Sequence, residues 1–140
     1  MASRLNPYLS FTDNARQAME FYHGVFGGDL VLNTFGEFGD PGGPFAELIM
    51  HAMLTTPQGF TLMAADTPPE MPYASGTSIT VSLSGDDDAE LRGFWSKLSE
   101  EGSISFPLEK QMWGDVFGQC VDRFGVGWMV NITTKPGLSE

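Results

Sequence analysis

The stretch DNARQAMEFYHGVFGG, residues 13–28, predicts one amphipathic helix with both of its ends marked. Its apolar residues recur at i, i+3, i+4, i+7, i+10 and i+11, a spacing that gathers side chains on one helix face. Asp13 or Asn14 can cap the first turn, and Gly27 and Gly28 can end the helix. The apolar stripe comprises Ala15, Ala18, Met19, Tyr22, Val25 and Phe26.

Short extended segments flank this helix and predict strands. Residues 6–11 come before it, and residues 30–35, 45–54 and 60–65 follow it. The turn sequence TTPQG, residues 55–59, joins the last two segments as a hairpin. The first half of the chain therefore has the expected order strand, helix and three strands.

The second half repeats this order. Residues 78–83 alternate polar and apolar side chains like a half-buried strand, and the carboxylates of residues 86–88 favour a helix N-terminus after it. Gly102 can end this second helix. Its apolar stripe comprises Leu91, Phe94, Trp95 and Leu98. Three further strands are expected at residues 104–108, 116–121 and 127–132.

Two copies of one element order predict an α+β fold built from paired βαβββ modules. Neither half alone can cover both faces of its sheet, so the modules are expected to pack together. We expect a single domain over residues 1–140, with module one at about 5–67 and module two at about 76–133. The linker at residues 66–76 contains three prolines.

Composition limits the partners of the chain. Its 140 residues include 7 Lys and Arg against 18 Asp and Glu, a formal net charge of −11. Such a field repels phosphate backbones and anionic lipid surfaces, so neither nucleic acid nor membrane is expected as a partner. The single cysteine, Cys120, excludes an intrachain disulfide and suits a reducing compartment. With no apolar run typical of a signal peptide or a membrane span, we expect a cytoplasmic protein.

Six motifs lie along nearly the whole chain, from about residue 5 to 133. They are NPYLSF at 6–11, FY and FGG within 21–28, HA at 51–52, LMAAD at 62–66, W and FG within 113–118, and DRFGVGWMVN at 122–131. Together they resemble PhnB-like proteins of the glyoxalase/bleomycin-resistance/dioxygenase (vicinal oxygen chelate) superfamily. The resemblance implies paired βαβββ modules in a curved mixed sheet around a cup, a homodimer, and a divalent metal in the cup of active relatives.

The resemblance also implies where a metal would be held. Metal-dependent members place His, Glu or Gln ligands on the first, fourth, fifth and eighth strands, and the corresponding positions here are Pro7, Met63, Ser78 and Met129. Proline and methionine do not supply the nitrogen and carboxylate donors of Ni²⁺, Zn²⁺ or Fe²⁺ sites. We therefore predict no metal and no other cofactor. A divalent metal held by His51 with Glu47 or Glu109 stays open as an alternative.

His51 is the candidate residue with the most versatile chemistry, because imidazole titrates near neutral pH. Period-two alternation along its strand predicts two faces. The face expected to look into the cup carries Glu47, Ile49, His51 and Met53, and the face expected to pack under the helices carries Leu48, Met50, Ala52 and Leu54. Both a structural and a ligand-binding role remain open for His51.

The same parity argument assembles an amphipathic pocket. Its walls are aromatic and thioether side chains, with a few hydroxyls, amides and one imidazole, a composition typical of small-molecule sites. The predicted ligand-binding residues are Leu9, Phe11, His51, Ser78, Thr80, Gln111, Trp113, Met129 and Asn131. No catalytic set of Ser, His and Asp or of Cys and His can be argued from order and spacing, so the catalytic residues are unknown.

Three hypotheses about function follow. In the first, the chain binds a small, partly apolar molecule in the cup without the usual four-ligand metal site. In the second, it is a divalent-metal-dependent lyase, isomerase, dioxygenase or thiol transferase of the same superfamily. In the third, it is a dimeric structural or drug-sequestering protein without catalysis. Fold alone does not select among them, because one fold carries many functions.

Overall fold

The computed structural model describes residues 3–39, 41–68, 71, 73–74 and 76–133. The chain divides into two compact units, Met1–Ser75 and Gly76–Glu140, and this division falls within the expected linker. Neither helix among these residues has the length and the apolar run that crossing a bilayer requires.

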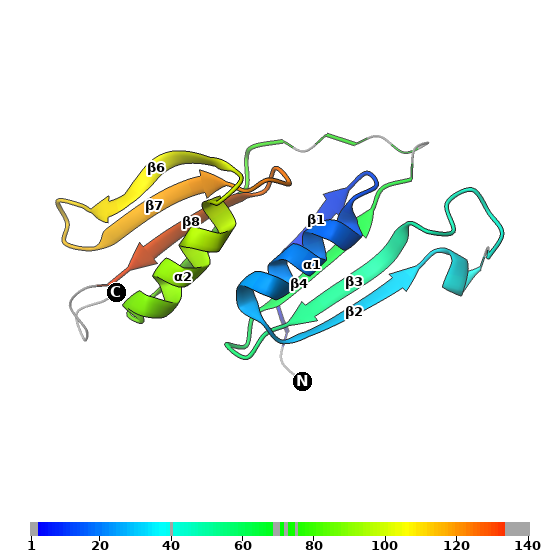
Figure 1. Ribbon diagram of the computed structural model, residues 1–140, viewed down its shortest axis with the longest axis horizontal. Coiled ribbons are helices and arrows are strands. Elements are labelled where there is room, and N and C mark those ends of the chain that lie inside the picture. The colour runs from blue at the N-terminus through cyan, green and yellow to red at the C-terminus, as the bar shows by residue number, and fades with distance from the viewer. Residues whose placement is uncertain (1–2, 40, 69–70, 72, 75, 134–140) are drawn as a thin grey trace. The chain divides into compact units, whose positions relative to one another are not determined.

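The first unit has one helix and four strands (Figure 1). Its elements are β1 (Tyr8–Phe11), α1 (Ala15–Phe26), β2 (Asp29–Thr34), the short 3-10 helix η1 (Gly36–Phe38), β3 (Ile49–Thr55) and β4 (Thr61–Asp66). The strands form a sheet in the order β1-β4-β3-β2, in which β1 and β4 are parallel and the other pairs are antiparallel.

The second unit repeats this topology. Its elements are β5 (Val81–Gly85), α2 (Asp88–Ser99), β6 (Ser103–Lys110), β7 (Val116–Val121) and β8 (Gly127–Ile132). The sheet order β5-β8-β7-β6 matches the first, again with one parallel pair, β5 and β8. The predicted α+β fold of two βαβββ modules is therefore confirmed.

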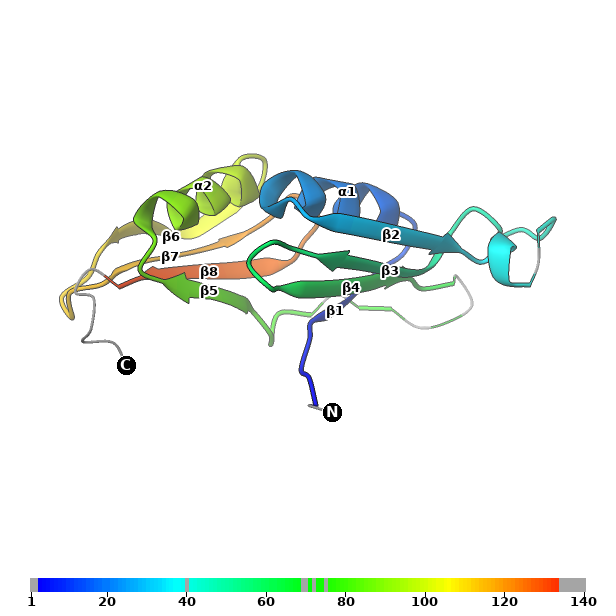
Figure 2. The ribbon, with the colours of Figure 1, turned by 90° about the horizontal axis from the view of Figure 1, so that it is seen from below.

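In each unit the helix covers one face of its own sheet, as Figure 2 shows for both. We call this face the helix face and the opposite one the open face. The core lies between helix and helix face. Its largest fully buried side chains are Met19, Tyr22, Ile49 and Leu54 in the first unit, and Leu98, Cys120, Trp128, Val130 and Ile132 in the second. Both predicted apolar stripes are buried.

The N-terminus of α1 is capped from a distance, and the predicted local cap is wrong. The Asn14 side chain makes no cap hydrogen bond. Instead, the buried carboxylate of Asp66, 51 residues along the chain, accepts from the backbone N–H of Ala15 at 2.9 Å. Its second oxygen accepts from the N–H of Ile49, also at 2.9 Å. The hydrogen bonds of Asp66 thus connect the start of α1 and the start of β3 to the end of β4.

The second unit caps its helix locally, as predicted. The Asp87 side chain accepts from the N–H of Glu90 at 3.1 Å. A buried carboxylate again serves the core, because Asp122 accepts from the N–H groups of Phe124 and Val126 and from Trp128 Nε1. Asp122 therefore closes the β7–β8 turn and satisfies the indole of the largest core side chain.

Candidate functional site

The open face of the first sheet carries an imidazole beside two thioethers. On β3, Ala52 and Leu54 are completely buried, whereas His51 and Met53 are half-buried. Because side chains alternate along a strand, His51 and Met53 point to the open face. Met53 pairs in register with Met63 of the neighbouring β4, so both thioethers lie on that face. His51 and Met53 therefore lie on the face opposite Ala52 and Leu54, which is the separation that the alternation predicts for these four residues.

Tyr8 completes this group from β1. It pairs in register with Met63, which places it on the same face, and its side chain is 52% exposed. The ring centroids of Tyr8 and His51 are 5.9 Å apart, with the ring planes tilted by 49°. We call Tyr8, His51, Met53 and Met63 the Tyr8–His51 cluster. It combines a phenol and an imidazole with an apolar thioether floor.

The predicted placement of Leu9 and Phe11 in the cup is wrong. Leu9 pairs with Ala64, which is completely buried, and Phe11 is only 2% exposed. Both side chains therefore belong to the helix face, with Phe11 in the core. The physical reason is hydrophobic burial: a sheet turns its more apolar face toward the helix, and here Tyr8 and Ser10 form the more polar face of β1.

Ile49 is a second correction to the predicted parity. The register between β2 and β3 shifts, because Asn33 pairs with His51 while the next residue, Thr34, pairs with Ile49. Met50 is the extra residue of a β-bulge, and a bulge reverses the alternation of side chains beyond it. Ile49 is accordingly 1% exposed and lies in the core, not on the face of His51. The strand also begins at Ile49 instead of residue 45, since residues 43–48 form turns.

The open face of the second sheet carries two of the predicted residues. On β8, Trp128, Val130 and Ile132 are buried, and the alternating Met129 and Asn131 are half-buried. Met129 and Asn131 therefore lie on the open face, opposite these core residues. Trp128 is in the core, which agrees with its opposite parity.

A polar pair and an aromatic pair lie at one end of this face. Asn131 Nδ2 donates to Asp115 Oδ2 at 3.0 Å. Trp113, in the turn between β6 and β7, is 61% exposed, and its ring centroid is 6.2 Å from that of Phe117. Gln111 lies in the same turn, where its Nε2 donates to the carbonyl of Glu109 at 2.8 Å. Trp113 and Gln111 thus occupy the loop position that the sequence predicts.

The predicted placement of Ser78 and Thr80 on the fifth strand is wrong. β5 begins at Val81, so both residues precede it, and Ser78 is exposed. Leu83 is buried under α2, which leaves Ser82 as the β5 hydroxyl in register with Met129. The predicted strand begins three residues too early, because polar and apolar residues already alternate in the loop before β5.

The residues at the metal positions do not fit a first-row divalent metal. Three of the four, Pro7, Met63 and Met129, offer no side-chain nitrogen or carboxylate donor, and the fourth, Ser78, lies outside β5. Within the described ranges, no three His, Cys, Asp or Glu side chains are grouped so that they could hold a metal ion.

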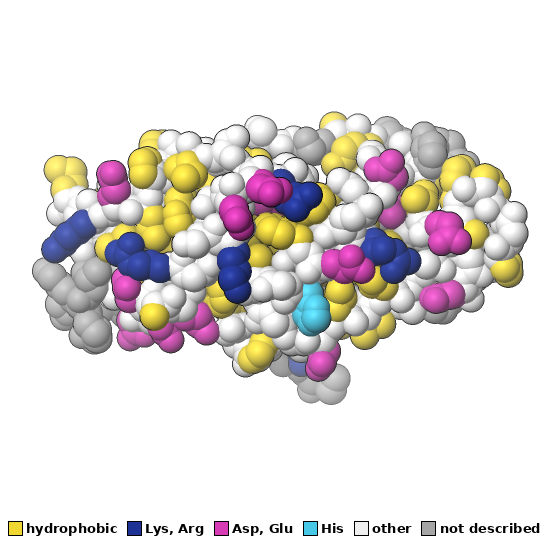
Figure 3. Space-filling view, in the orientation of Figure 1, with side chains coloured by type: hydrophobic (Ala, Val, Ile, Leu, Met, Phe, Trp, Pro, Cys, Tyr) yellow, Lys and Arg dark blue, Asp and Glu magenta, His cyan; other side chains and the backbone are white. Residues whose placement is uncertain are grey.

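The remaining chemical groups have structural surroundings. Burial, and secondarily the negative charge of Asp122, raises the pKa of the Cys120 thiol to about 11, so it is protonated near neutral pH. His23 is exposed on α1, where its Nε2 is 2.9 Å from the carbonyl oxygen of Gly28. On the side that Figure 3 shows, acidic and basic side chains are interspersed, and Arg92 pairs with Asp88 along α2. This side has the character of an ordinary solvated surface.

Sequence reasoning missed two residues of the open faces, Tyr8 and Phe117. The signal for Tyr8 was present, since Phe11 is more apolar than Ser10 and should have set the parity of β1. Phe117 lies on β7 between Val116 and Gly118, which both face the core. The strand was predicted correctly. Because most of its residues are apolar, the sequence does not show on which face of the sheet Phe117 lies.

Known proteins resemble this chain over nearly its full length. The structure of protein PA1353 from Pseudomonas aeruginosa shares 38% identity, with a TM-score of 0.85, over 94% of this chain and 98% of that one. Protein YjdN from Escherichia coli is 29% identical over 94% of this chain and 96% of its own length. A Bacillus cereus structure described as a putative 3-demethylubiquinone-9 3-methyltransferase, PhnB protein, has a TM-score of 0.76 at 24% identity, covering 94% and 100% of the two chains. At that identity the likeness shows the shared fold.

The family model of the Glyoxalase/Bleomycin resistance protein/Dioxygenase superfamily matches residues 4–130. This match spans both βαβββ units and agrees with the resemblance seen in the motifs. The chain belongs to the glyoxalase/bleomycin resistance protein/dioxygenase superfamily.

Proposed function

We propose that this protein binds a small, partly apolar molecule on the open faces of its sheets, without the four-ligand metal site of metal-dependent relatives. The observation that carries the proposal is the Tyr8–His51 cluster. It brings a phenol and an imidazole together above Met53 and Met63, on the face of the sheet opposite α1.

The chemistry of the cluster supports a ligand with two kinds of surface. Thioethers are polarizable and adapt to irregular apolar shapes, so Met53 and Met63 can contact a hydrocarbon or aromatic body. The phenol and the imidazole can each donate and accept hydrogen bonds, so they can orient a polar substituent. Small-molecule sites commonly combine apolar walls with a few such polar groups.

A homodimer is part of this proposal. The content of large apolar residues, 11 Phe, 8 Met and 3 Trp, is high for 140 residues, and a stable dimer interface buries such side chains. Light scattering should give about twice 15.2 kDa at micromolar concentration. A particle of one chain's mass across that range would contradict dimerisation and leave ligand binding untouched.

The test begins with a thermal-shift screen of neutral and charged aromatic metabolites, followed by calorimetric titration of each hit. Replacing His51 by Ala should weaken binding about 2- to 10-fold, because a hydrogen bond to ligand contributes roughly 0.5–1.5 kcal/mol. His23→Ala is the matched control, since it removes the other histidine from an exposed helix position. Its affinity should equal that of the wild type.

Two outcomes would contradict the proposal. If His51→Ala lowers the urea midpoint by the equivalent of roughly 1–3 kcal/mol and leaves affinity unchanged, His51 is a structural residue. If elemental analysis finds about one divalent metal per chain that is lost on replacing His51, the metal-dependent alternative holds instead.

A further inference from the structure

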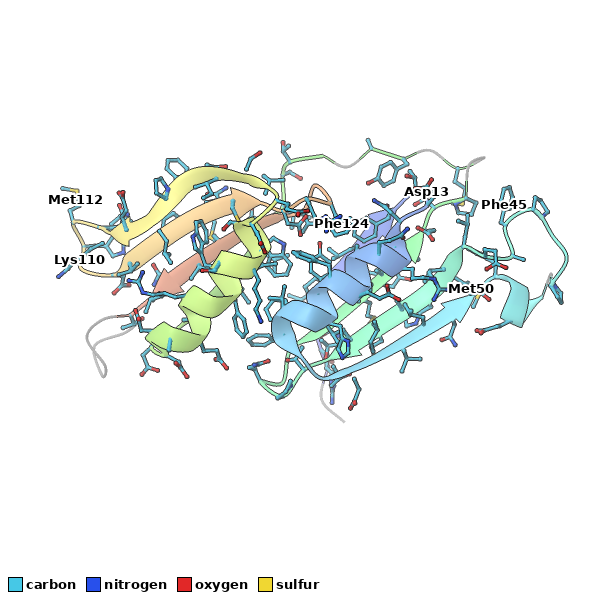
Figure 4. All side chains as sticks on the ribbon, viewed as in Figure 1. Asp13, Phe45, Met50, Lys110, Met112 and Phe124 are labelled. Carbon is cyan, nitrogen blue, oxygen red and sulfur yellow. The ribbon has the colours of Figure 1, made fainter. Side chains whose placement is uncertain are left out.

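Trp113 is the exposed member of an aromatic pair at one end of the second sheet. It is 61% exposed, although its ring contacts Phe117 with centroids 6.2 Å apart and planes at 60°. Figure 4 shows Lys110 and Met112 at the same end of the β6–β7 hairpin, and Met112 is 98% exposed. The contact with Phe117 holds the indole against the sheet while much of its surface stays open to a ligand.

Carboxylates lie on both sides of this aromatic pair. Phe117 pairs in register with Glu109 of β6 and with Asn131 of β8, so these three side chains share the open face. Asn131 Nδ2 donates to Asp115 Oδ2 at 3.0 Å. This hydrogen bond fixes the carboxylate of Asp115 without neutralising its charge.

No basic side chain offsets these carboxylates on the described part of this open face. The strand residues that the register places on this face are Ser82, Ser84, Ser103, Phe106, Glu109, Phe117, Gln119, Val121, Met129 and Asn131. Lys110 pairs in register with the buried Val116 and so belongs to the helix face. The net charge of −11 adds a field of the same sign.

We propose that Trp113 and Phe117, between Glu109 and Asp115, form a binding site for an organic cation, an ammonium group carried on an apolar body. Indole is the side chain that attracts a cation over its ring most strongly, and nearby carboxylates add a Coulomb attraction. This inference rests on the proposed function and narrows its ligand class at this end of the second sheet. Binding requires no metal and no covalent step.

The test compares choline with its neutral isostere 3,3-dimethylbutan-1-ol by titration of the Trp113 indole N–H signal in NMR spectra. The Trp113→Phe spectrum lacks the Trp113 signal and therefore assigns it. The other two tryptophans, Trp95 and Trp128, are buried. Choline should bind at least about 5-fold more tightly than the isostere, because an exposed cation–π contact and a flanking charge contribute together. Raising the salt concentration should reduce this preference.

Variants separate the two parts of the site. Glu109→Gln keeps the shape of the side chain and should weaken choline about 2- to 3-fold, with no effect on the isostere. Glu100→Gln is the matched control, because it removes the same charge from an exposed position at the end of α2. That control should leave the affinity for choline unchanged. Trp113→Ala, followed through the Gln119 and Asn131 amide signals, should abolish choline binding.

The outcomes distinguish this inference from the proposed function. Equal affinities for choline and the isostere, both lost in Trp113→Ala, would overturn the cation preference and leave small-molecule binding standing. No response of Trp113 to either probe, with binding retained at His51 in the screen above, would overturn this site alone. Loss of the dimer in Trp113→Ala by light scattering would assign the indole to an interface between copies and overturn the inference.

Discussion

The carboxylate of Asp66 should be worth more to stability than any exposed acidic residue in the chain. It is 4% exposed and accepts from two backbone N–H groups, those of Ala15 and Ile49, each at 2.9 Å. The Ala15 N–H is one of the donors that a helix N-terminus cannot satisfy internally. Asp66 therefore supplies both a helix cap and a link between α1 and β3.

The magnitude follows from these contacts. A hydrogen bond to a charged group contributes about 1.5–3 kcal/mol, and the charge of a carboxylate near a helix N-terminus adds roughly 0.3–1 kcal/mol. Asp66→Ala removes both acceptors and the charge, so the free energy of unfolding should fall by about 3–7 kcal/mol. Asp66→Asn keeps one acceptor oxygen and turns an amino group toward the other N–H, so about 1–3 kcal/mol should be lost.

Urea unfolding followed by far-UV circular dichroism measures these changes. Asp13→Ala is the control, because Asp13 is exposed beside the same helix terminus and is one of the caps that the sequence suggests. It should change stability by no more than about 0.5 kcal/mol. A loss of less than about 1 kcal/mol in Asp66→Ala, or an equal loss in Asp13→Ala, would show that Asp66 is not the cap of α1.

Two further predictions concern the core of the second unit. Gly118→Ala should destabilise by roughly 1–3 kcal/mol, because a Cβ there would lie 2.9 Å from the backbone Cα of Leu108 and 2.8 Å from Trp95 Cη2. Gly93→Ala, on α2 with open space around it, should instead stabilise by about 0.5–1 kcal/mol, and equal effects of the two changes in urea titrations would contradict this account. Cys120 has its pKa raised from 9.0 to about 11, so the unfolded chain releases this proton at lower pH than the folded one. The thiol's contribution to stability should be complete below about pH 9 and fall as pH rises toward 11, and a thiol reagent at pH 8 should label native protein far more slowly than urea-unfolded protein. Equal labelling rates would show that Cys120 is accessible.

Features that depend on neighbouring residues could be predicted from the amino-acid sequence. The helix α1 follows from the 3.6-residue spacing of its apolar stripe and from the glycines after it, and its predicted end at Phe26 is the observed one. The strands β7 and β8 have the predicted bounds, since short apolar runs between turn residues are local signals. Because these local patterns occur twice along the chain, they were sufficient to predict the two βαβββ units.

Contacts between residues that lie far apart in the sequence could not be predicted, because they depend on how the strands pair. The cap of α1 comes from Asp66, whose contact with Ala15 spans 51 residues, so no local pattern could reveal it. The core position of Ile49 depends on a bulge that exists only in the pairing of β2 with β3. Likewise, Tyr8 contacts His51 because β1 pairs in parallel with β4, which sets the register of two segments that are distant in the sequence. Periodicity fixes the alternation of side chains along a strand, but the side that reaches the core depends on how the strand pairs.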